Sequence, residues 1–123
     1  MSRQYVAIAV AGNRHLERDF DRLRADHGDL AAARAYLRDA AATERLFDRR
    51  LLRLSLPPRV EVIAHLLVSA NESRARLTDK AAASASFPQL HGYEPRLTAA
   101  NAPVEEAVRV IRSLLGLPPP ETS

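Results

Sequence analysis

Apolar residues recur along most of this chain at intervals of three and four positions, which is the repeat of an amphipathic helix. The first stripe consists of Tyr5, Ile8, Ala9, Gly12, Asn13, Leu16, Phe20 and Leu23. Later stripes keep the same spacing, and together they predict four long helices over residues 3–26, 30–54, 58–83 and 94–115. The sequence therefore predicts an all-α fold without a β-sheet.

Turn-forming residues separate the stripes. Gly28 suits the left-handed position that follows a helix, and Asp29 can cap the next one. Leu56 precedes a proline and is disfavoured in a helix, whereas Pro58 fits the first turn of the third helix. Residues 84–91 predict a loop followed by a short turn.

Prolines complicate the last stripe. A proline inside a helix removes one backbone hydrogen bond and clashes with the preceding turn, so we expect the helix over residues 94–115 to be interrupted or kinked near Pro103. Gly116 is its expected C-cap. Residues 118–123 then form a proline-rich tail.

The connections between the predicted helices are short, which favours pairing of successive helices in opposite directions. The expected architecture is an antiparallel up-down-up-down four-helix bundle. A chain of 123 residues fits one domain with its own core. We therefore expect residues 1–117 to form a single domain.

Three asparagines, Asn13, Asn71 and Asn101, occupy positions within the apolar stripes. Counting outward from the predicted turns places them at one height in the bundle, near Thr43 or Glu44. Three interpretations are open: a chance alignment with some amides in solvent, a hydrogen-bonded network that fixes register, or a ligand site between helices. If the layer binds a ligand, the site residues are Asn13, Glu44, Asn71 and Asn101.

Charge and composition exclude several kinds of functional site. The chain has no cysteine, which excludes disulfides, thiolate metal sites and cysteine nucleophiles. Its 18 basic and 15 acidic residues give a net charge of +3. Because the acids are interleaved with the arginines, we expect no tight binding to nucleic acid. An arginine-rich face of the predicted second helix leaves one alternative open, an intracellular helical adaptor or a nucleic-acid-associated protein. The arginines of this face are Arg45, Arg49, Arg50 and Arg53.

Catalytic and metal-binding patterns give little support to an enzyme. The sequence contains no Gly-x-Ser-x-Gly and no glycine-rich phosphate loop. Glu61 and His65 are four positions apart, whereas a di-iron bundle uses Glu-x-x-His on two helices. We expect no catalytic residue, no metal and no cofactor, and a metal or haem bundle is the third and weakest interpretation. No segment has the ~18 consecutive apolar residues of a membrane span.

The layout resembles that of uncharacterised actinobacterial secreted proteins and lipoproteins whose mature domains are short helical bundles. The matching features are Tyr5, Asn13, the pair Phe47 and Leu51, the segment Leu56 to Pro58, and the segment Leu115 to Pro120. The lipobox cysteine and the Ser/Gly-rich spacer of that group are missing from this sequence. The resemblance implies an extracytoplasmic or cell-surface location, with a cytoplasmic one as the alternative.

The expected function is non-enzymatic. The resemblance brings no known activity and no catalytic residues. We expect the bundle to bind a partner protein or a small ligand, and the sequence does not identify either.

Overall fold

The computed structural model describes residues 2–25 and 29–120, and for residues 19–25 the backbone only. These residues form five helices: α1 (Ser2–Ala25), α2 (Leu30–Leu52), α3 (Pro58–Ala82), α4 (Phe87–His91) and α5 (Glu94–Leu114). No strand occurs in the ranges described. The predicted all-α fold is confirmed, and the expected short turn at residues 87–91 is the helix α4.

The helices begin where the sequence provides caps. The Asp29 side chain accepts a hydrogen bond from the backbone amide of Ala32 at 3.1 Å, as expected for the N-cap of α2. The Ser86 hydroxyl accepts in the same way from the amide of Gln89 at 3.2 Å and caps α4. Gly28, the predicted end of the preceding helix, lies outside the described residues.

Helix α5 continues through its internal proline. It runs without a break over Glu94–Leu114 with Pro103 inside it, so the expected interruption is wrong, and a kink at this position stays a prediction. Pro103 leaves the carbonyl of Ala99 without its amide partner, and both residues are exposed. Water can therefore replace the missing hydrogen bond.

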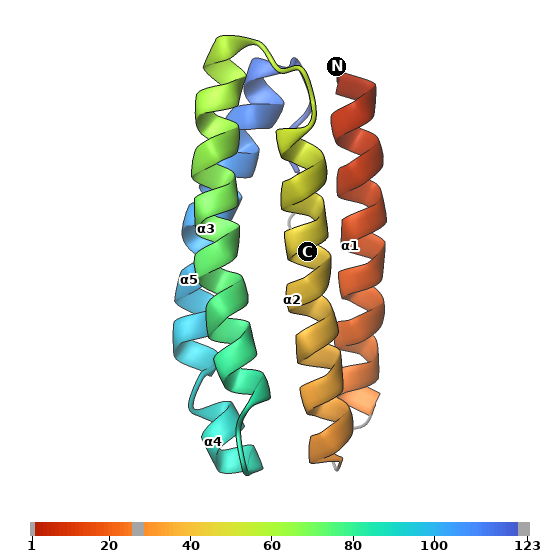
Figure 1. Ribbon diagram of the computed structural model, residues 1–123, viewed down its shortest axis with the longest axis vertical. Helices are drawn as coiled ribbons and strands as arrows, with labels where there is room; N and C mark the ends of the chain where they lie inside the picture. Colours follow the sequence, from red (N-terminus) through yellow and green to blue (C-terminus); the bar gives the residue numbers. More distant parts are fainter. Residues whose placement is uncertain (1, 26–28, 121–123) are drawn as a thin grey trace.

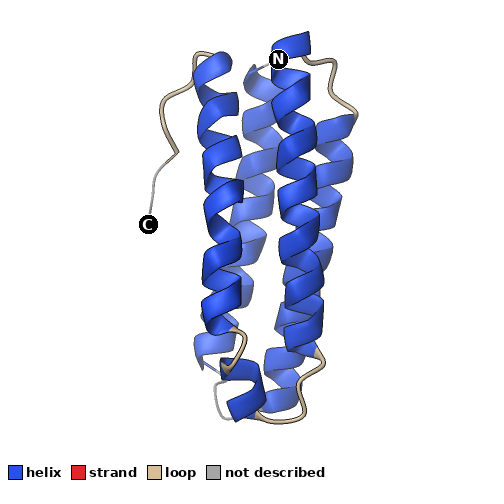
Figure 2. Cartoon of the chain, turned by 90° about the vertical axis from the view of Figure 1, so that its left-hand side faces the viewer, coloured by secondary structure: helices blue, strands red, loops and turns tan. Residues whose placement is uncertain are grey.

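The end of α5 confirms the predicted glycine cap. Gly116 has φ +71°, a conformation that favours glycine. Its amide donates to the carbonyl of Ser113 at 3.1 Å, and the amide of Leu117 donates to that of Arg112 at 2.8 Å, which is the Schellman pattern. Arg112 Nε also donates to the carbonyl of Pro118 at 2.7 Å, and the tail turns back from the end of α5 (Figure 2).

The long helices lie side by side in the order in which they follow along the chain. Helix α2 packs on both α1 and α3, and α3 packs on α5. The connection between α2 and α3 lies at the top of Figure 1, and the α4 segment joins α3 to α5 at the bottom. Helices α1 and α5 are not among the pairs that pack extensively, so the outer pair of helices leaves one side of the array open.

Two apolar clusters form the core. The larger cluster lies towards the end of the molecule that holds the α2–α3 connection, and its buried members are Tyr5, Leu51, Val60, Ala64, Leu67, Val104, Ala107 and Ile111. The smaller cluster lies at the α4 end, with Ala33, Leu37, Ala81, Ala82 and Leu90. Buried polar side chains, including Asp48 and Asn71, separate the two.

Candidate functional site

Two buried polar side chains join α2 and α3 between the apolar clusters. Asn71 is 3% exposed and Asp48 is 5% exposed. The Asn71 Nδ2 donates to Asp48 Oδ1 at 2.7 Å. Because a buried polar group without a partner is costly, this bond helps to hold the two helices in register.

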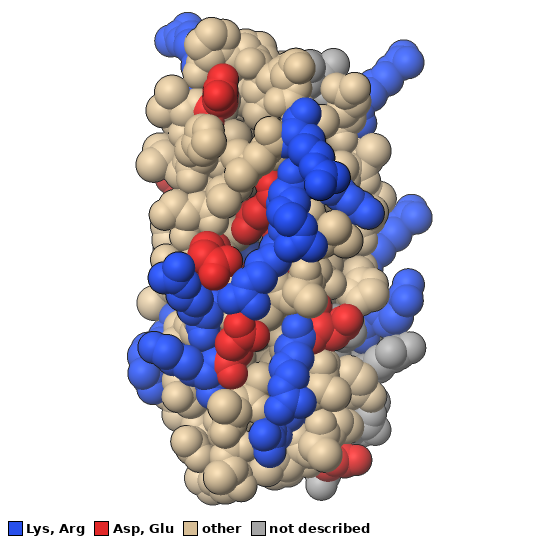
Figure 3. Space-filling model, viewed as in Figure 1, with Lys and Arg blue, Asp and Glu red and all other residues tan. Residues whose placement is uncertain are grey.

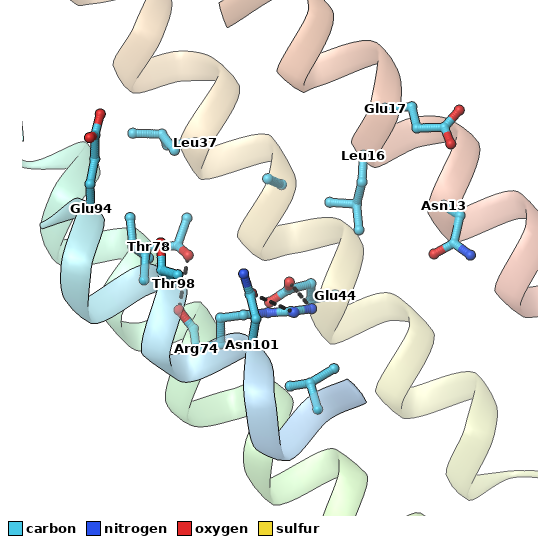
Figure 4. A pocket seen from close by; sticks show the side chains of 13 residues that line it. Asn13, Leu16, Glu17, Leu37, Glu44, Arg74, Thr78, Glu94, Thr98 and Asn101 are labelled. Atoms are coloured by element: carbon cyan, nitrogen blue, oxygen red, sulfur yellow. Dashed lines mark hydrogen bonds and ion pairs between the residues drawn. The ribbon is translucent and has the colours of Figure 1, made fainter. Parts of the chain in front are cut away.

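Arg74 connects the same layer to α5. Its Nη2 lies 2.5 Å from Glu44 Oε1 in an ion pair between α3 and α2, and its Nη1 donates to Asn101 Oδ1 at 3.1 Å. The side chains of Arg74 and Glu44 are only 19% and 10% exposed. Figure 4 shows the Arg74 guanidinium between Glu44 and Asn101. One cation therefore ties three helices together near the middle of the molecule.

The surroundings of the layer raise the pKa of both of its acids, Asp48 and Glu44. Burial raises the pKa of Asp48 from 3.8 to about 6, and the nearby carboxylates of Glu44 and Glu72 add to the increase. The hydrogen bond from Asn71 and the charge of Arg74 act in the opposite direction. Burial also raises the pKa of Glu44, and it outweighs the ion pair with Arg74. The layer thus holds two acids, one buried and one largely shielded, against the single cation Arg74.

The layer does not satisfy all of its own hydrogen-bonding groups. Among the described residues, Glu44 Oε2, Asn71 Oδ1 and Arg74 Nε are buried and have no hydrogen-bond partner. Buried polar groups in folded proteins are nearly always paired. The three unpaired atoms of this small network are therefore available to pair with water or with a bound molecule.

A cleft borders the layer and is lined by all four long helices. It is a pocket of about 630 Å³, and its exposed lining residues Asn13 and Glu17 on α1 and Glu94 and Thr98 on α5 mark its two rims. Its apolar walls are formed by Leu16, Leu37, Ala40, Leu97 and Val104, and its polar floor by Glu44, Arg74, Thr78 and Asn101.

A smaller pocket of about 120 Å³ shares Glu44 and Arg74 with this cleft. Tyr5 and Phe47 line it, and their rings meet edge to face with centroids 6.4 Å apart. Pro120 of the tail also lines it. The wide cleft therefore adjoins a narrow, largely apolar recess, with which it also shares Asn13, Leu16 and Val104.

The structure unites most, but not all, of the residues proposed from the sequence. Asn101 and Glu44 bind the same Arg74 guanidinium, and Asn71 lies one turn away on α3. Asn13 instead is exposed and lines the cleft from α1. It lines the cleft together with Glu44 and Asn101, and no hydrogen bond joins its side chain to theirs among the described residues. Its place at the height of the other three residues stays a prediction (Figure 4).

Two central residues are not singled out by sequence reasoning. Arg74 lies three positions after Asn71, and its charge gives no indication that it pairs inside the core. Asp48 lies four positions after Glu44, so both side chains lie on one face of α2. This spacing of two acids on a buried face, opposite Asn71, is the signal that identifies Asp48.

Other chemical groupings are weak in the part of the chain described. Glu61 Oε1 lies 3.9 Å from His65 Nε2, and both side chains are more than half exposed. Within the described ranges, no three side chains of His, Cys, Asp or Glu are grouped so that they can hold a metal ion. No helix in those ranges is long and apolar enough to cross a membrane.

Arg45 on α2 and Arg76 on α3 are paired with acids. Arg45 lies 3.2 Å from Glu72 and 2.8 Å from Asp79, and Arg76 lies 3.3 Å from the same Glu72. On the face drawn in Figure 3, carboxylates lie among the arginines.

Comparisons with models of protein families, with curated proteins and with solved structures give no match. The residues of this chain are therefore the basis for its proposed function.

Proposed function

We propose that this chain is an antiparallel up-down-up-down four-helix bundle that binds a small ligand in the cleft between α1 and α5. The observation that carries the proposal is the set of unpaired atoms of Glu44, Asn71 and Arg74 in a network that borders the cleft of about 630 Å³. We propose Asn13, Glu44, Asn71 and Asn101 as ligand-binding residues, with Arg74 as the group that positions Glu44 and Asn101.

The size and lining of the cleft support a small ligand. Ligand pockets have volumes of roughly 300–1,000 Å³ and combine apolar walls with a few polar groups that fix orientation. Leucines from three helices, Leu16, Leu37 and Leu97, form the walls of this cleft, and the polar groups are gathered on its floor. A partner protein would instead be recognised by a broader exposed surface.

The unpaired atoms weigh against a purely structural layer. Each buried polar atom without a partner costs about 1–3 kcal/mol, and a clamp that fixes register gains nothing from leaving three of them unpaired. A ligand that supplies the missing partners would recover part of this cost on binding.

The proposal is binding without catalysis. Arg74, Glu44 and Asn101 are engaged with one another, and a network of this kind is suited to orienting a bound molecule. The resemblance to exported actinobacterial bundles supports an extracytoplasmic location. The pairing of Arg45 with Glu72 and Asp79 weighs against the alternative of a nucleic-acid-associated protein, because paired arginines release few counterions.

Benzyl alcohol, a small neutral molecule with an apolar ring and one hydroxyl, can test the site. In a titration followed by ¹H–¹⁵N NMR, we expect the largest shifts at Leu37, Leu97 and Thr98. Asn13→Trp places a bulky side chain at the α1 rim and should abolish these shifts. Arg14→Trp is the matched control, because Arg14 is also exposed on α1 and is not part of the cleft lining.

The two variants make the test decisive once circular dichroism has shown that both remain helical. Cleft shifts that survive in Arg14→Trp and disappear in Asn13→Trp support the site. Shifts scattered over the surface, or unchanged in Asn13→Trp, contradict it.

A further inference from the structure

We propose that the ligand of this cleft is a small organic cation, an alkylammonium whose charged group meets the floor and rims while its apolar chain extends towards Tyr5 and Phe47. This inference rests on the proposed ligand-binding function and names the chemical class of the ligand. It is carried by the charge of the lining, the unpaired acceptors and the apolar recess.

The charge of the lining is negative. The ionisable side chains of the cleft are Glu17, Glu44, Glu94 and Arg74. Arg74 and Glu44 neutralise each other in their ion pair. Glu17 and Glu94 remain, one on each rim, and no ion pair joins either of them to a cation among the residues that the structure describes. A cation that enters the cleft is attracted from both sides, whereas an anion is repelled.

The unpaired atoms of the floor provide a second and independent observation. The Glu44 side chain is 10% exposed, it lines the cleft, and its Oε2 has no partner among the described residues. Asn71, which lines the adjoining smaller pocket, has an unpaired acceptor at Oδ1, whereas Arg74 Nε is the single unpaired donor of the three residues. An ammonium group has three donors and no acceptor, so it fits the place where the cleft meets the smaller pocket, because unpaired acceptors outnumber unpaired donors there.

The recess beyond the floor fits the apolar part of such a ligand. Tyr5, Phe47, Leu67 and Val108 line this smaller pocket. It shares Glu44 and Arg74 with the wider cleft, so a molecule with its charge at Glu44 can place a chain of several carbons there. Burial of the chain supplies affinity, and the acids determine the sign of the charged group.

Three probes of equal chain length separate the contributions. Hexylammonium, hexanol and hexanoate are titrated at pH 7 with the full chain and followed by ¹H–¹⁵N NMR. We expect hexylammonium to bind about tenfold more tightly than hexanol, because a charge-assisted hydrogen bond adds to the same apolar contact. Hexanoate should bind more weakly than hexanol.

Two sets of variants test the assignment to residues. Glu17→Gln with Glu94→Gln changes exposed side chains, so the fold is expected to be kept, and the preference for hexylammonium over hexanol should fall severalfold. Glu105→Gln, an exposed acid on α5 that does not line the cleft, is the control and should leave the preference unchanged. Glu44→Gln should reduce it further.

The outcomes distinguish this inference from the proposed function. If hexanol or hexanoate binds in the cleft as tightly as hexylammonium, the inference that the ligand is a cation is overturned. The proposal that the cleft binds a small ligand is then kept. The inference of a cation is also overturned if Glu105→Gln reduces the preference for hexylammonium as much as the combined changes Glu17→Gln and Glu94→Gln do. No binding by any of the three probes overturns the proposed ligand site itself.

Discussion

The two apolar clusters show how one set of helices can be packed firmly at one end and left open at the other. The larger cluster contains Tyr5, Leu51, Leu67 and Ile111, each at most 1% exposed, and draws on all four long helices. Three of the five buried members of the smaller cluster are alanines. Large side chains fill the space between four helices, whereas alanines bring α2 and α3 together and leave the cleft beside them.

The largest expected effect is in the large cluster. Leu67 is fully buried, and Leu67→Ala should lower the free energy of unfolding by about 4 kcal/mol because it leaves a cavity that its neighbours cannot fill. Leu37→Ala in the small cluster should cost about 2 kcal/mol or less, since Leu37 already borders the cleft. Urea denaturation measures both, and equal losses would break the comparison between the clusters.

The ion pair between the clusters should come next. Arg74→Met leaves Glu44 buried without its partner, and we expect a loss of about 3 kcal/mol in the free energy of unfolding. Adding Glu44→Gln removes the stranded charge and should restore at least half of that loss. A double-mutant cycle by urea denaturation gives the coupling, and strictly additive effects would show that the two residues act independently.

Asp48 adds a pH dependence to the region between the clusters. Its folded pKa of about 6 lies above its ordinary value of 3.8, so folding disfavours the ionised form. The stability that this group contributes is fully present below pH ~4 and is lost as the pH rises to about 6. The loss is at most about 3 kcal/mol, and the free energy of unfolding does not change further above that pH. Asp48→Asn should therefore stabilise the protein at pH 7 by about 1–2 kcal/mol.

The Asp48 effect has a clear signature in urea denaturation across this pH range. The difference between Asp48→Asn and the parent should be small at pH 4 and grow towards pH 6, whereas Glu105→Gln on the surface should show no such growth. A loss of stability in Asp48→Asn at pH 7 would mean that the carboxylate supports the layer in its charged form.

The smallest expected effect concerns α1. A Cβ added at Gly12 meets no atom within 4 Å, so Gly12→Ala should stabilise the helix by about 0.5–1 kcal/mol. Gly92→Ala is the contrast, because its Cβ would lie 3.2 Å from the backbone oxygen of Gln89 and no gain is expected. Thermal unfolding followed by circular dichroism compares the two variants. An increase in the midpoint of the main transition for Gly12→Ala is expected only if α1 unfolds together with the other helices.

The helices could be predicted from the sequence because their signals are local. The three/four-residue spacing, Asp29 as a cap and Gly116 as a C-cap place the observed helix ends within two residues of the predicted ones at each described end. The internal Pro103 is the exception, because the sequence shows that a hydrogen bond is lost and does not show that the affected carbonyl is exposed.

The site could be predicted only in part, because it depends on how far apart helices lie. Periodicity places Asn71, Asn101 and Glu44 on inner faces. It carries no information on the separation of α1 from α5, which leaves Asn13 on a rim. The length of the Arg74 side chain also allows it to reach Glu44 and Asn101 from different helices, and stripe patterns do not reveal where a long side chain ends.

The one-sided attachment of α1 has a consequence for local opening. This helix packs along α2, and it reaches α5 near its first turn, where Ser2 Oγ donates to the carbonyl of Leu115 at 3.2 Å. A helix held in this way can detach as a unit while α2, α3 and α5 stay together. Its amide hydrogens would then exchange with solvent through an opening that costs less than global unfolding. A molecule bound between α1 and α5 closes the open side, so its occupancy can be read out as slower exchange along α1.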